Sequence, residues 1–273
     1  MTLEPSHIEL RGVAKSYRSG RALRQVVEDC SFTIEPGKLT VMIGPSGAGK
    51  STLVRLIAGF ERPERGEILA GGKPVRGPGR DRQVMFQECA LFPWMTTAGN
   101  VVYGPKARGE LTSETKDVCE ELIESTGLSE FRSKYPAHLS GGMQRRAELV
   151  RAMVNEPALM ILDEPFRGLD ALTKKLMLEL YAELCERSPR TTLFVTTDVE
   201  EALFLADRVL VMSHIPTRVV DTVDVDLPRP RQFAGLLADD RANDLKIRLL
   251  SLLHQEAMRS FGTGHPSRHS RSA

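Results

Sequence analysis

The chain has 273 residues, enough for one large domain or two small ones with a buried core. Lys and Arg number 37 and Asp and Glu 36, and this formal net charge of +1 indicates no strong field for nucleic acid or anionic lipid. Hydrophobic residues make up 41% and charged residues 27%, which is ordinary globular usage and excludes wholesale disorder and fibrous repeats.

The sequence contains no apolar run near the roughly 20 residues needed to cross a bilayer. Its first ten residues carry acids and a proline where a secretory signal would carry basic and then apolar residues, so we expect the chain to stay in the cytosol. The cysteines are scattered, without a CxxC pair or clustered histidines, which predicts neither a zinc site nor a disulfide framework. We expect reduced thiols with packing roles at Cys30, Cys89, Cys119 and Cys185.

Short strand patterns broken by turn residues begin the chain, and we expect strands at residues 7–13, 26–34 and 39–43. The last of these is apolar throughout, as a buried strand would be. A helical pattern runs from Gly49 to Phe60, and Pro63 prevents its continuation. Glycine and proline then favour hairpins and edge strands around residues 67–70 and 83–86.

From about Glu88 to Ala152, helical spacing replaces the strand patterns, which predicts a helical insertion. Strand patterns return afterwards and alternate with helical ones, as in a parallel α/β sheet. The expected strands cover residues 158–162, 192–196 and 208–212, and the expected helices cover residues 173–186 and 199–206. A last amphipathic helix is expected near residues 242–261, and the polar, glycine-rich end is not expected to fold alone.

A glycine-rich segment follows the buried strand and opens the first helix, and it matches the phosphate-binding P-loop pattern. In that context backbone N–H groups and the helix N-terminus bind phosphate oxygens, Lys50 reaches the β- and γ-phosphates, and the Ser51 hydroxyl binds Mg²⁺. A simple glycine turn is the alternative. The predicted ATP-binding residues here are Gly44, Pro45, Ser46, Gly47, Ala48, Gly49, Lys50, Ser51 and Thr52.

Two adjacent carboxylates end the apolar run at residues 159–162. Ligands of open α/β sheets collect at the carboxyl ends of the strands, so these side chains are predicted to lie beside the bound phosphates. Asp163 is suited to the magnesium shell, and Glu164 to polarising the attacking water as a general base. The alternative is that the pair only caps the segment that follows.

A second glycine cluster, LSGGM at residues 139–143, also opens a helix and is a second candidate anion site. Two phosphate sites are redundant in one chain, but they make sense if two copies meet head to tail. Each P-loop would then face Ser140, Gly141 and Gly142 of the other copy across one ATP. The alternative is an ordinary serine N-cap with glycines for a turn.

With these three motifs in this order, the sequence resembles the ATP-binding subunits of ABC transporters over about residues 7–230. The resemblance implies an α/β fold: a P-loop NTPase (RecA-like) parallel sheet core with an antiparallel β subdomain and an inserted α-helical subdomain. We expect residues 1–87 and 153–215 to form the ATP-binding core with the β subdomain, 88–152 the helical signature subdomain, 216–261 a C-terminal extension and 262–273 a disordered tail.

Four further segments are similar to the nitrate/sulfonate/taurine importer branch of the family: FQECALFPWMT, LDEPFRGLDALT, DVEEALFLADRV and DLPRPR. By that resemblance Gln87 senses Mg²⁺ and the γ-phosphate, Tyr17 stacks on adenine, and Asp170 faces the partner subunit. An exposed polar residue, a core tyrosine and a helix cap are the respective alternatives. The surface that meets the permease corresponds to Leu91, Phe92, Trp94 and Met95, for which core packing is the alternative.

One position departs from the family pattern. Where the family has a histidine that reaches the γ-phosphate, the chain has Thr197. A threonine hydroxyl can donate a hydrogen bond, but it is several atoms shorter and has no positive form. Losing one positioned donor can lower turnover on the order of 100-fold, so we expect slow ATP hydrolysis with intact nucleotide binding.

The resemblance therefore implies an ATP-hydrolysing subunit, with ATP and Mg²⁺ as ligands, of an importer for a small anionic solute such as nitrate, a sulfonate or taurine. Its expected partners are a second copy or a related ATPase subunit, an integral membrane permease and, indirectly, an extracytoplasmic solute-binding protein, with no nucleic acid. The expected location is the cytoplasmic face of the inner membrane. A weakly active or regulatory nucleotide-binding partner is one alternative, and an ABC protein acting on ribosomes or DNA is another.

Overall fold

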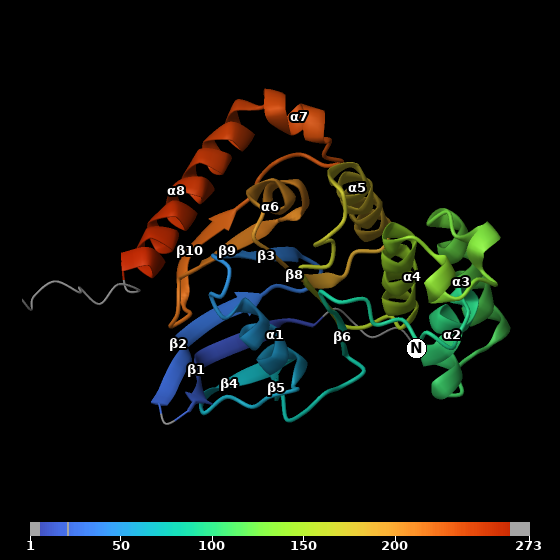
Figure 1. The fold of residues 1–273 in the computed structure, drawn as a ribbon, viewed down its shortest axis with the longest axis horizontal. Helices are drawn as coiled ribbons and strands as arrows, with labels where there is room; N and C mark the ends of the chain where they lie inside the picture. The colour runs from blue at the N-terminus through green and yellow to red at the C-terminus, as the bar shows by residue number, and fades with distance from the viewer. Residues whose placement is uncertain (1–5, 21, 263–273) are drawn as a thin grey trace, which may run out of the picture.

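A six-stranded sheet forms the centre of the molecule (Figure 1). The structure is a computed structural model that describes residues 6–20 and 22–262. The strand order is β10-β9-β3-β8-β7-β6, parallel except for β10, which pairs antiparallel with β9. The strands are β3 (Leu39–Ile43), β6 (Arg82–Met85), β7 (Leu159–Asp163), β8 (Thr191–Thr196), β9 (Arg208–Met212) and β10 (Val219–Asp224).

Both faces of this sheet are covered, which explains the continuous apolar runs in its strands. On one face Val41 and Ile43 pack with α5 (Ala171–Arg187) and α6 (Val199–Leu205). On the other face Met42 packs with α1 (Lys50–Ala58). Because successive strand side chains point to opposite faces, one strand contributes to both cores.

An antiparallel sheet of order β2-β1-β4-β5 lies on the α1 side of the molecule (Figure 1). Apolar side chains of its strands share one core with α1 and the central sheet. The strands are β1 (Ile8–Ser19), β2 (Ala22–Ile34), β4 (Arg65–Ala70) and β5 (Lys73–Pro74).

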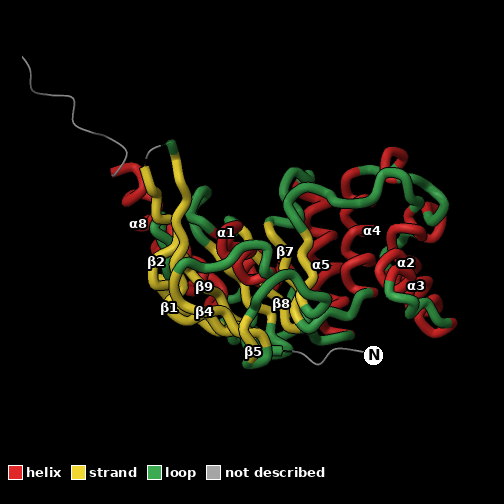
Figure 2. Tube along the Cα trace, turned by 90° about the horizontal axis from the view of Figure 1, so that it is seen from below, coloured by secondary structure: helices red, strands yellow, loops and turns green. Residues whose placement is uncertain are grey.

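The helical segment lies at the other end of the molecule from the antiparallel sheet (Figure 2). It comprises α2 (Thr97–Ala107), α3 (Ser113–Ser125), α4 (Gly141–Val154) and two short 3₁₀ turns, Ser129–Phe131 and Pro136–His138. A small core of its own includes Val101, Ile123 and Val150. Hydroxyl caps at Thr96, Thr112 and Ser140 begin the three α-helices.

Two C-terminal helices, α7 (Phe233–Ala238) and α8 (Asp240–Gly262), lie over α6 (Figure 1). Arg231 holds their connection in place. Its guanidinium donates to the carbonyls of Leu203 (3.0 Å) and Ala206 (2.6 Å) at the end of α6, and to Val225 and Leu227 (both 3.2 Å) in the connecting segment. The DLPRPR segment thus acts here as a cap for α6.

The predicted fold class is confirmed: a parallel P-loop core, an antiparallel β part and an inserted helical part are all present. Sequence reasoning missed β10 and α7. Strand β10 alternates half-buried and exposed residues at a sheet edge, and α7 is only six residues long, too short for a clear helical period. The domain boundaries remain predictions, and the predicted tail after residue 262 lies outside the described residues.

All four cysteines are free. Cys30 and Cys119 are buried, but Cys89 is exposed, so the expected packing role is wrong for Cys89. Within residues 6–20 and 22–262, no helix combines the length and the apolar composition that a membrane span requires.

Candidate active site

The P-loop connects β3 to α1 at the carboxyl end of the central sheet. Gly47 and Gly49 have φ angles of 76° and 81°, in the left-handed region that favours glycine. A Cβ atom at Gly49 would also lie 2.3 Å from the Thr217 hydroxyl. Glycine is therefore required at Gly49 both by its backbone angles and by the close approach of the neighbouring segment.

Lys50 is the first residue of α1 and is only 5% exposed. Its ammonium group donates to the carbonyls of Gly44 (2.8 Å) and Pro45 (3.0 Å). Burial lowers the pKa of Lys50, while the carboxylates of Glu164 and Asp163 oppose that shift. The loop thus holds a buried cation beside two acidic groups.

Asp163 ends β7 and is 7% exposed. Burial raises its pKa, and a hydrogen bond from the Ser51 hydroxyl opposes the rise. The structure therefore brings together two of the three predicted magnesium ligands, both of them hard oxygen donors of the type Mg²⁺ prefers. The third, Gln87, is exposed just after β6, and its metal-sensing role remains a prediction.

Glu164 follows Asp163 in a left-handed conformation, with φ at 45°. Its N–H donates to the carbonyl of Val195 in β8 (2.9 Å), and its Oε2 accepts from Arg167 (2.9 Å). The side chain lines a hollow of about 240 Å³ that Ser46 and Thr197 also line. A water molecule in that hollow would lie between the P-loop and the predicted general base.

Thr197 follows β8, is exposed and lines the same hollow as Glu164. The neighbouring Thr196 is buried, and its hydroxyl donates to Glu201 (2.6 Å). Thr196 therefore stabilises the fold through its contact with Glu201, whereas Thr197 faces the hollow. The expected effect of Thr197 on turnover remains a prediction.

The LSGGM segment opens α4, and the Ser140 hydroxyl caps the helix by accepting from the N–H of Met143 (3.3 Å). Ser140, Gly141 and Gly142 line a separate hollow of about 630 Å³, which no residue of the P-loop lines among those described. A Cβ at Gly142 would lie 2.8 Å from the Thr173 side chain, so close packing of α4 on α5 needs a glycine there. The serine cap is confirmed, and the hollow leaves room for an anion as well.

Asp170 caps α5, since its carboxylate accepts from the N–H groups of Leu172 (3.1 Å) and Thr173 (3.0 Å). The hydroxyl of Thr173 is the main cause that lowers the pKa of Asp170. Asp170 also lines the hollow of the LSGGM segment, and Gly168, just before it, lines both hollows. The helix-cap interpretation is confirmed, and the predicted role toward a partner subunit remains open.

Tyr17 lies on β1 and is half-buried. Its hydroxyl donates to Glu61 (2.6 Å), and the ammonium group of Lys15 lies 5.5 Å from the ring centroid. Burial raises the pKa of Tyr17, and a hydrogen bond with Thr52 opposes the rise. The ring is therefore next to the end of the P-loop, although stacking on adenine remains a prediction.

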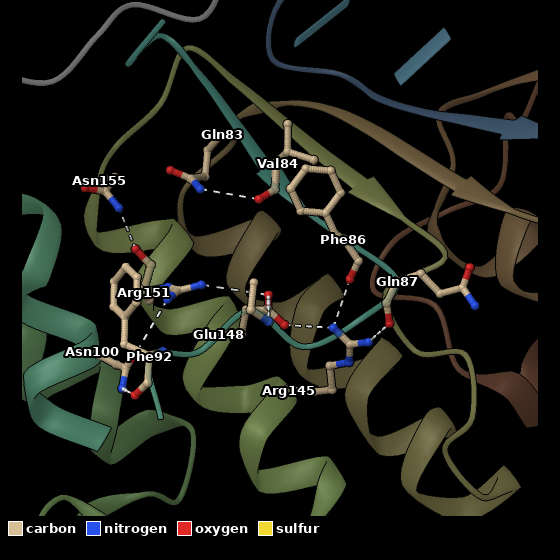
Figure 3. Close-up of polar contacts among 11 residues, drawn as sticks. Gln83, Val84, Phe86, Gln87, Phe92, Asn100, Arg145, Glu148, Arg151 and Asn155 are labelled. Carbon is tan, nitrogen blue, oxygen red and sulfur yellow. Dashed lines mark hydrogen bonds and ion pairs between the residues drawn. The ribbon is translucent and has the colours of Figure 1, made fainter. Parts of the chain in front are cut away.

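A buried ion pair on α4 holds the segment that contains Gln87, and sequence reasoning missed it (Figure 3). Arg145 and Glu148 are 6% and 2% exposed, and their side chains lie 2.7 Å apart. Arg145 donates to the backbone carbonyls of Phe86 (2.9 Å) and Gln87, while Glu148 accepts from the N–H of Ala90 (3.0 Å). Figure 3 shows the Gln87 side chain pointing away from this contact.

A second arginine of α4 extends the contact. Arg151 lies 3.8 Å from the Glu148 carboxylate and 5.2 Å from the ring centroid of Phe92 (Figure 3). Asn100 is fully buried and exchanges hydrogen bonds with the backbone of Phe92. The sequence does carry a signal for this pair: Arg145 and Glu148 have opposite charges and lie three positions apart, among the apolar positions of a helix.

We expect Glu148→Gln to destabilise the fold by about 3 kcal/mol, because it leaves the buried Arg145 and the half-buried Arg151 without their carboxylate. Urea unfolding followed by circular dichroism measures the change. The matched control is Glu183→Gln, which breaks the exposed pair Glu183–Arg187 on α5 and should change stability by less than about 1 kcal/mol. Equal effects of the two substitutions would contradict this assignment.

The residues predicted to meet the permease divide into two sets. Leu91 is 8% exposed and packs in the helical core, so the core-packing alternative holds for it. Trp94 is 69% exposed, and its ring lies 5.5 Å from that of Phe92. An exposed tryptophan beside a half-buried phenylalanine is a composition suited to an interface.

Comparisons with known proteins agree with this geometry. The family model described as ABC transporter matches residues 27–167. The chain is 36% identical over 257 residues to the nitrate import ATP-binding protein NrtD of Synechococcus elongatus, covering 93% of this chain and 94% of that protein. It is 40% identical over 220 residues to the taurine import ATP-binding protein TauB of Chromobacterium violaceum, covering 81% and 82%.

Among solved structures, the dimeric structure of a bacterial ABC transporter cassette is similar with a TM-score of 0.70 and 25% identity, covering 81% of this chain and all of that one. The family match contains the P-loop, the LSGGM helix and the carboxylate strand described above. The chain therefore belongs to the ABC transporter family and is one of its ATPase subunits.

Proposed function

We propose that the chain is the ATP-hydrolysing subunit of an importer for a small anionic solute of the nitrate, sulfonate or taurine type. One observation carries the proposal: Lys50, Asp163 and Glu164 converge at one edge of the sheet, in a chain similar to nitrate and taurine import subunits. The names of those relatives support the solute class.

Two copies of the chain are proposed to close around two ATP molecules. The P-loop and the LSGGM segment line different hollows of one chain, so neither hollow holds both phosphate-binding elements. A two-fold axis would place Ser140 of each copy opposite Lys50 of the other, which completes two equal sites. The similar solved cassette is itself dimeric. A related ATPase subunit could replace the second copy.

Hydrolysis is proposed to proceed by in-line attack of water on the γ-phosphate. Glu164 orients and polarises that water, while Lys50 and the LSGGM turn of the partner copy stabilise negative charge on the phosphates. A bound Mg²⁺ would neutralise charge on the β- and γ-phosphates, and the Ser51 hydroxyl and Asp163 carboxylate are the oxygen donors suited to hold it.

The proposed membrane partner is a permease that binds the surface around Trp94. The ion pair Arg145–Glu148 connects the LSGGM helix to the backbone of Gln87, so a movement of α4 would be transmitted to the Trp94 segment. The proposed location is therefore the cytoplasmic face of the inner membrane, and an extracytoplasmic binding protein is proposed to deliver the solute to the permease.

The test is solute uptake by proteoliposomes that contain the chain and the permease encoded beside its gene. The proposal is supported if nitrate, a sulfonate or taurine is taken up only when ATP is present on the side of the membrane where this chain lies. ATP hydrolysis by the chain without any solute movement would contradict the importer assignment. ATP binding without hydrolysis would favour the alternative, a regulatory nucleotide-binding partner subunit.

We expect Thr197→His to raise the steady-state rate of ATP hydrolysis about tenfold or more, because an imidazole reaches farther into the hollow and donates a stronger hydrogen bond. The measurement is phosphate release at saturating ATP, with and without the permease. Thr196→Ser, next to it but buried, is the control and should leave the rate nearly unchanged. An unchanged rate in Thr197→His would show that Thr197 does not limit turnover.

A further inference from the structure

We propose that Arg167 is a positioning residue for hydrolysis: it holds the Glu164 carboxylate in the orientation that polarises the attacking water. This inference rests on the proposed function, because it assigns Glu164 the role of general base. It adds a residue to the site and explains how a chain with Thr197 keeps that base oriented.

The fold places Arg167 over Glu164 by a tight turn. The N–H of Arg167 donates to the carbonyl of Glu164 (3.2 Å), and Phe166 between them is 1% exposed, with its ring 5.9 Å from that of Phe194. The Glu164 N–H is bound to Val195 of β8. The buried phenylalanine and the contact with β8 therefore fix the backbone positions from which the Glu164 and Arg167 side chains extend.

The pair leaves one carboxylate oxygen for water. Arg167 Nη1 lies 2.9 Å from Glu164 Oε2, and no protein donor to Oε1 is found among the described residues. In activated nucleophiles, a third group holds the general base through one atom while another atom of the base faces the reactant. The Arg167–Glu164 pair has the same arrangement. Because Arg167 is 59% exposed in its side chain, the ion pair contributes little to folding stability.

The other cations near Glu164 are already engaged. Lys174 lines the same hollow, but Asp198 and Glu201 each bind its ammonium group at 2.9 Å. Lys50 is held by the carbonyls of its own loop. Arg167 uses one of its five N–H groups on Glu164, and its charge also reaches the P-loop: together with burial, which is the larger cause, it lowers the pKa of Lys50.

Thr197 explains why the arginine is needed. Its hydroxyl is short and uncharged, and within the described residues it makes no hydrogen bond to Glu164. Arg167 lines the same hollow and binds the carboxylate directly, so it can supply the orientation that the threonine does not. A histidine at position 197 and the arginine at position 167 would then both help to orient the Glu164 carboxylate.

The experiment is a double-mutant cycle on the full-length chain. The variants are Arg167→Ala, Arg167→Lys, Thr197→His and the double variant Arg167→Ala/Thr197→His, and the control is Arg187→Ala, which removes a similarly exposed arginine from an ion pair with Glu183. For each we would measure kcat, KM and the Kd for ATP. We expect Arg167→Ala to lower kcat about tenfold or more, with KM and Kd changed less than about threefold. Arg167→Lys should restore part of kcat.

In the Thr197→His background, Arg167→Ala should lower kcat by less than about threefold, since the histidine replaces the lost donor. Equal losses in both backgrounds, a loss no larger than that of Arg187→Ala, or a rise in kcat would each overturn the inference. A parent chain that binds no ATP would instead refute the proposed function itself, so the two failures are distinguishable.

Discussion

Glu164→Gln is expected to lower the rate of ATP hydrolysis at least 100-fold while leaving ATP binding intact. The amide has nearly the shape of the carboxylate but accepts no proton, and general-base catalysis contributes roughly 10²- to 10⁴-fold. Because Glu164 lines the hollow beside the P-loop while Lys50 and Ser51 are unaltered, the phosphates should still bind. ATP-bound dimers should therefore persist in this variant.

Two measurements check this result. Phosphate release gives the rate, and size-exclusion chromatography with ATP gives the oligomeric state. Glu183→Gln, an exposed position on α5, is the matched control and should behave as the parent chain. A Glu164→Gln variant that hydrolyses ATP at the parent rate would remove the general base from the proposed mechanism. One that stays monomeric with ATP would count against the closed pair.

Lys50→Ala is expected to weaken ATP binding about 30-fold or more. Removing one partner of a buried, hydrogen-bonded charge pair typically costs about 2–5 kcal/mol, and each 1.4 kcal/mol is tenfold in affinity. Lys50 is buried, and its ammonium group is the cation that the P-loop itself supplies. The substitution also removes the positive charge opposite Asp163 and Glu164.

Titration with a fluorescent ATP analogue measures the affinity, and circular dichroism shows whether the variant is folded. Lys116→Ala, at an exposed lysine of α3, is the control and should bind ATP with the parent affinity. Unchanged affinity in a folded Lys50→Ala variant would refute the assignment of the phosphate site, whatever the outcome for Glu164.

The phosphate site was predictable from the sequence because its geometry is local. A buried strand, a glycine loop and a helix that starts at Lys50 are contiguous, so the pattern of residues is sufficient to place the backbone N–H groups and the lysine. Asp163 was predictable for a related reason: it ends a parallel strand, and the strand ends of such a sheet lie at one edge. The helical insertion was predictable because the spacing of its apolar residues changes from a strand period to a helix period. Strand β10 is too exposed and helix α7 too short to show a recognisable period.

What the sequence by itself determined, then, is the family, the fold class and the residues whose placement depends on neighbours along the chain. The tertiary structure alone decided that Arg145 and Glu148 bind the backbone beside Gln87, that Leu91 is buried while Trp94 is exposed, and that Arg167 and Thr197 face the same hollow as Glu164. The contacts of Arg145 and Glu148, and the approach of Thr197 to Glu164, join segments far apart in the chain, and the burial of Leu91 depends on the packing of the whole helical segment. Partners in such contacts are chosen by side-chain packing and desolvation rather than by spacing along the chain.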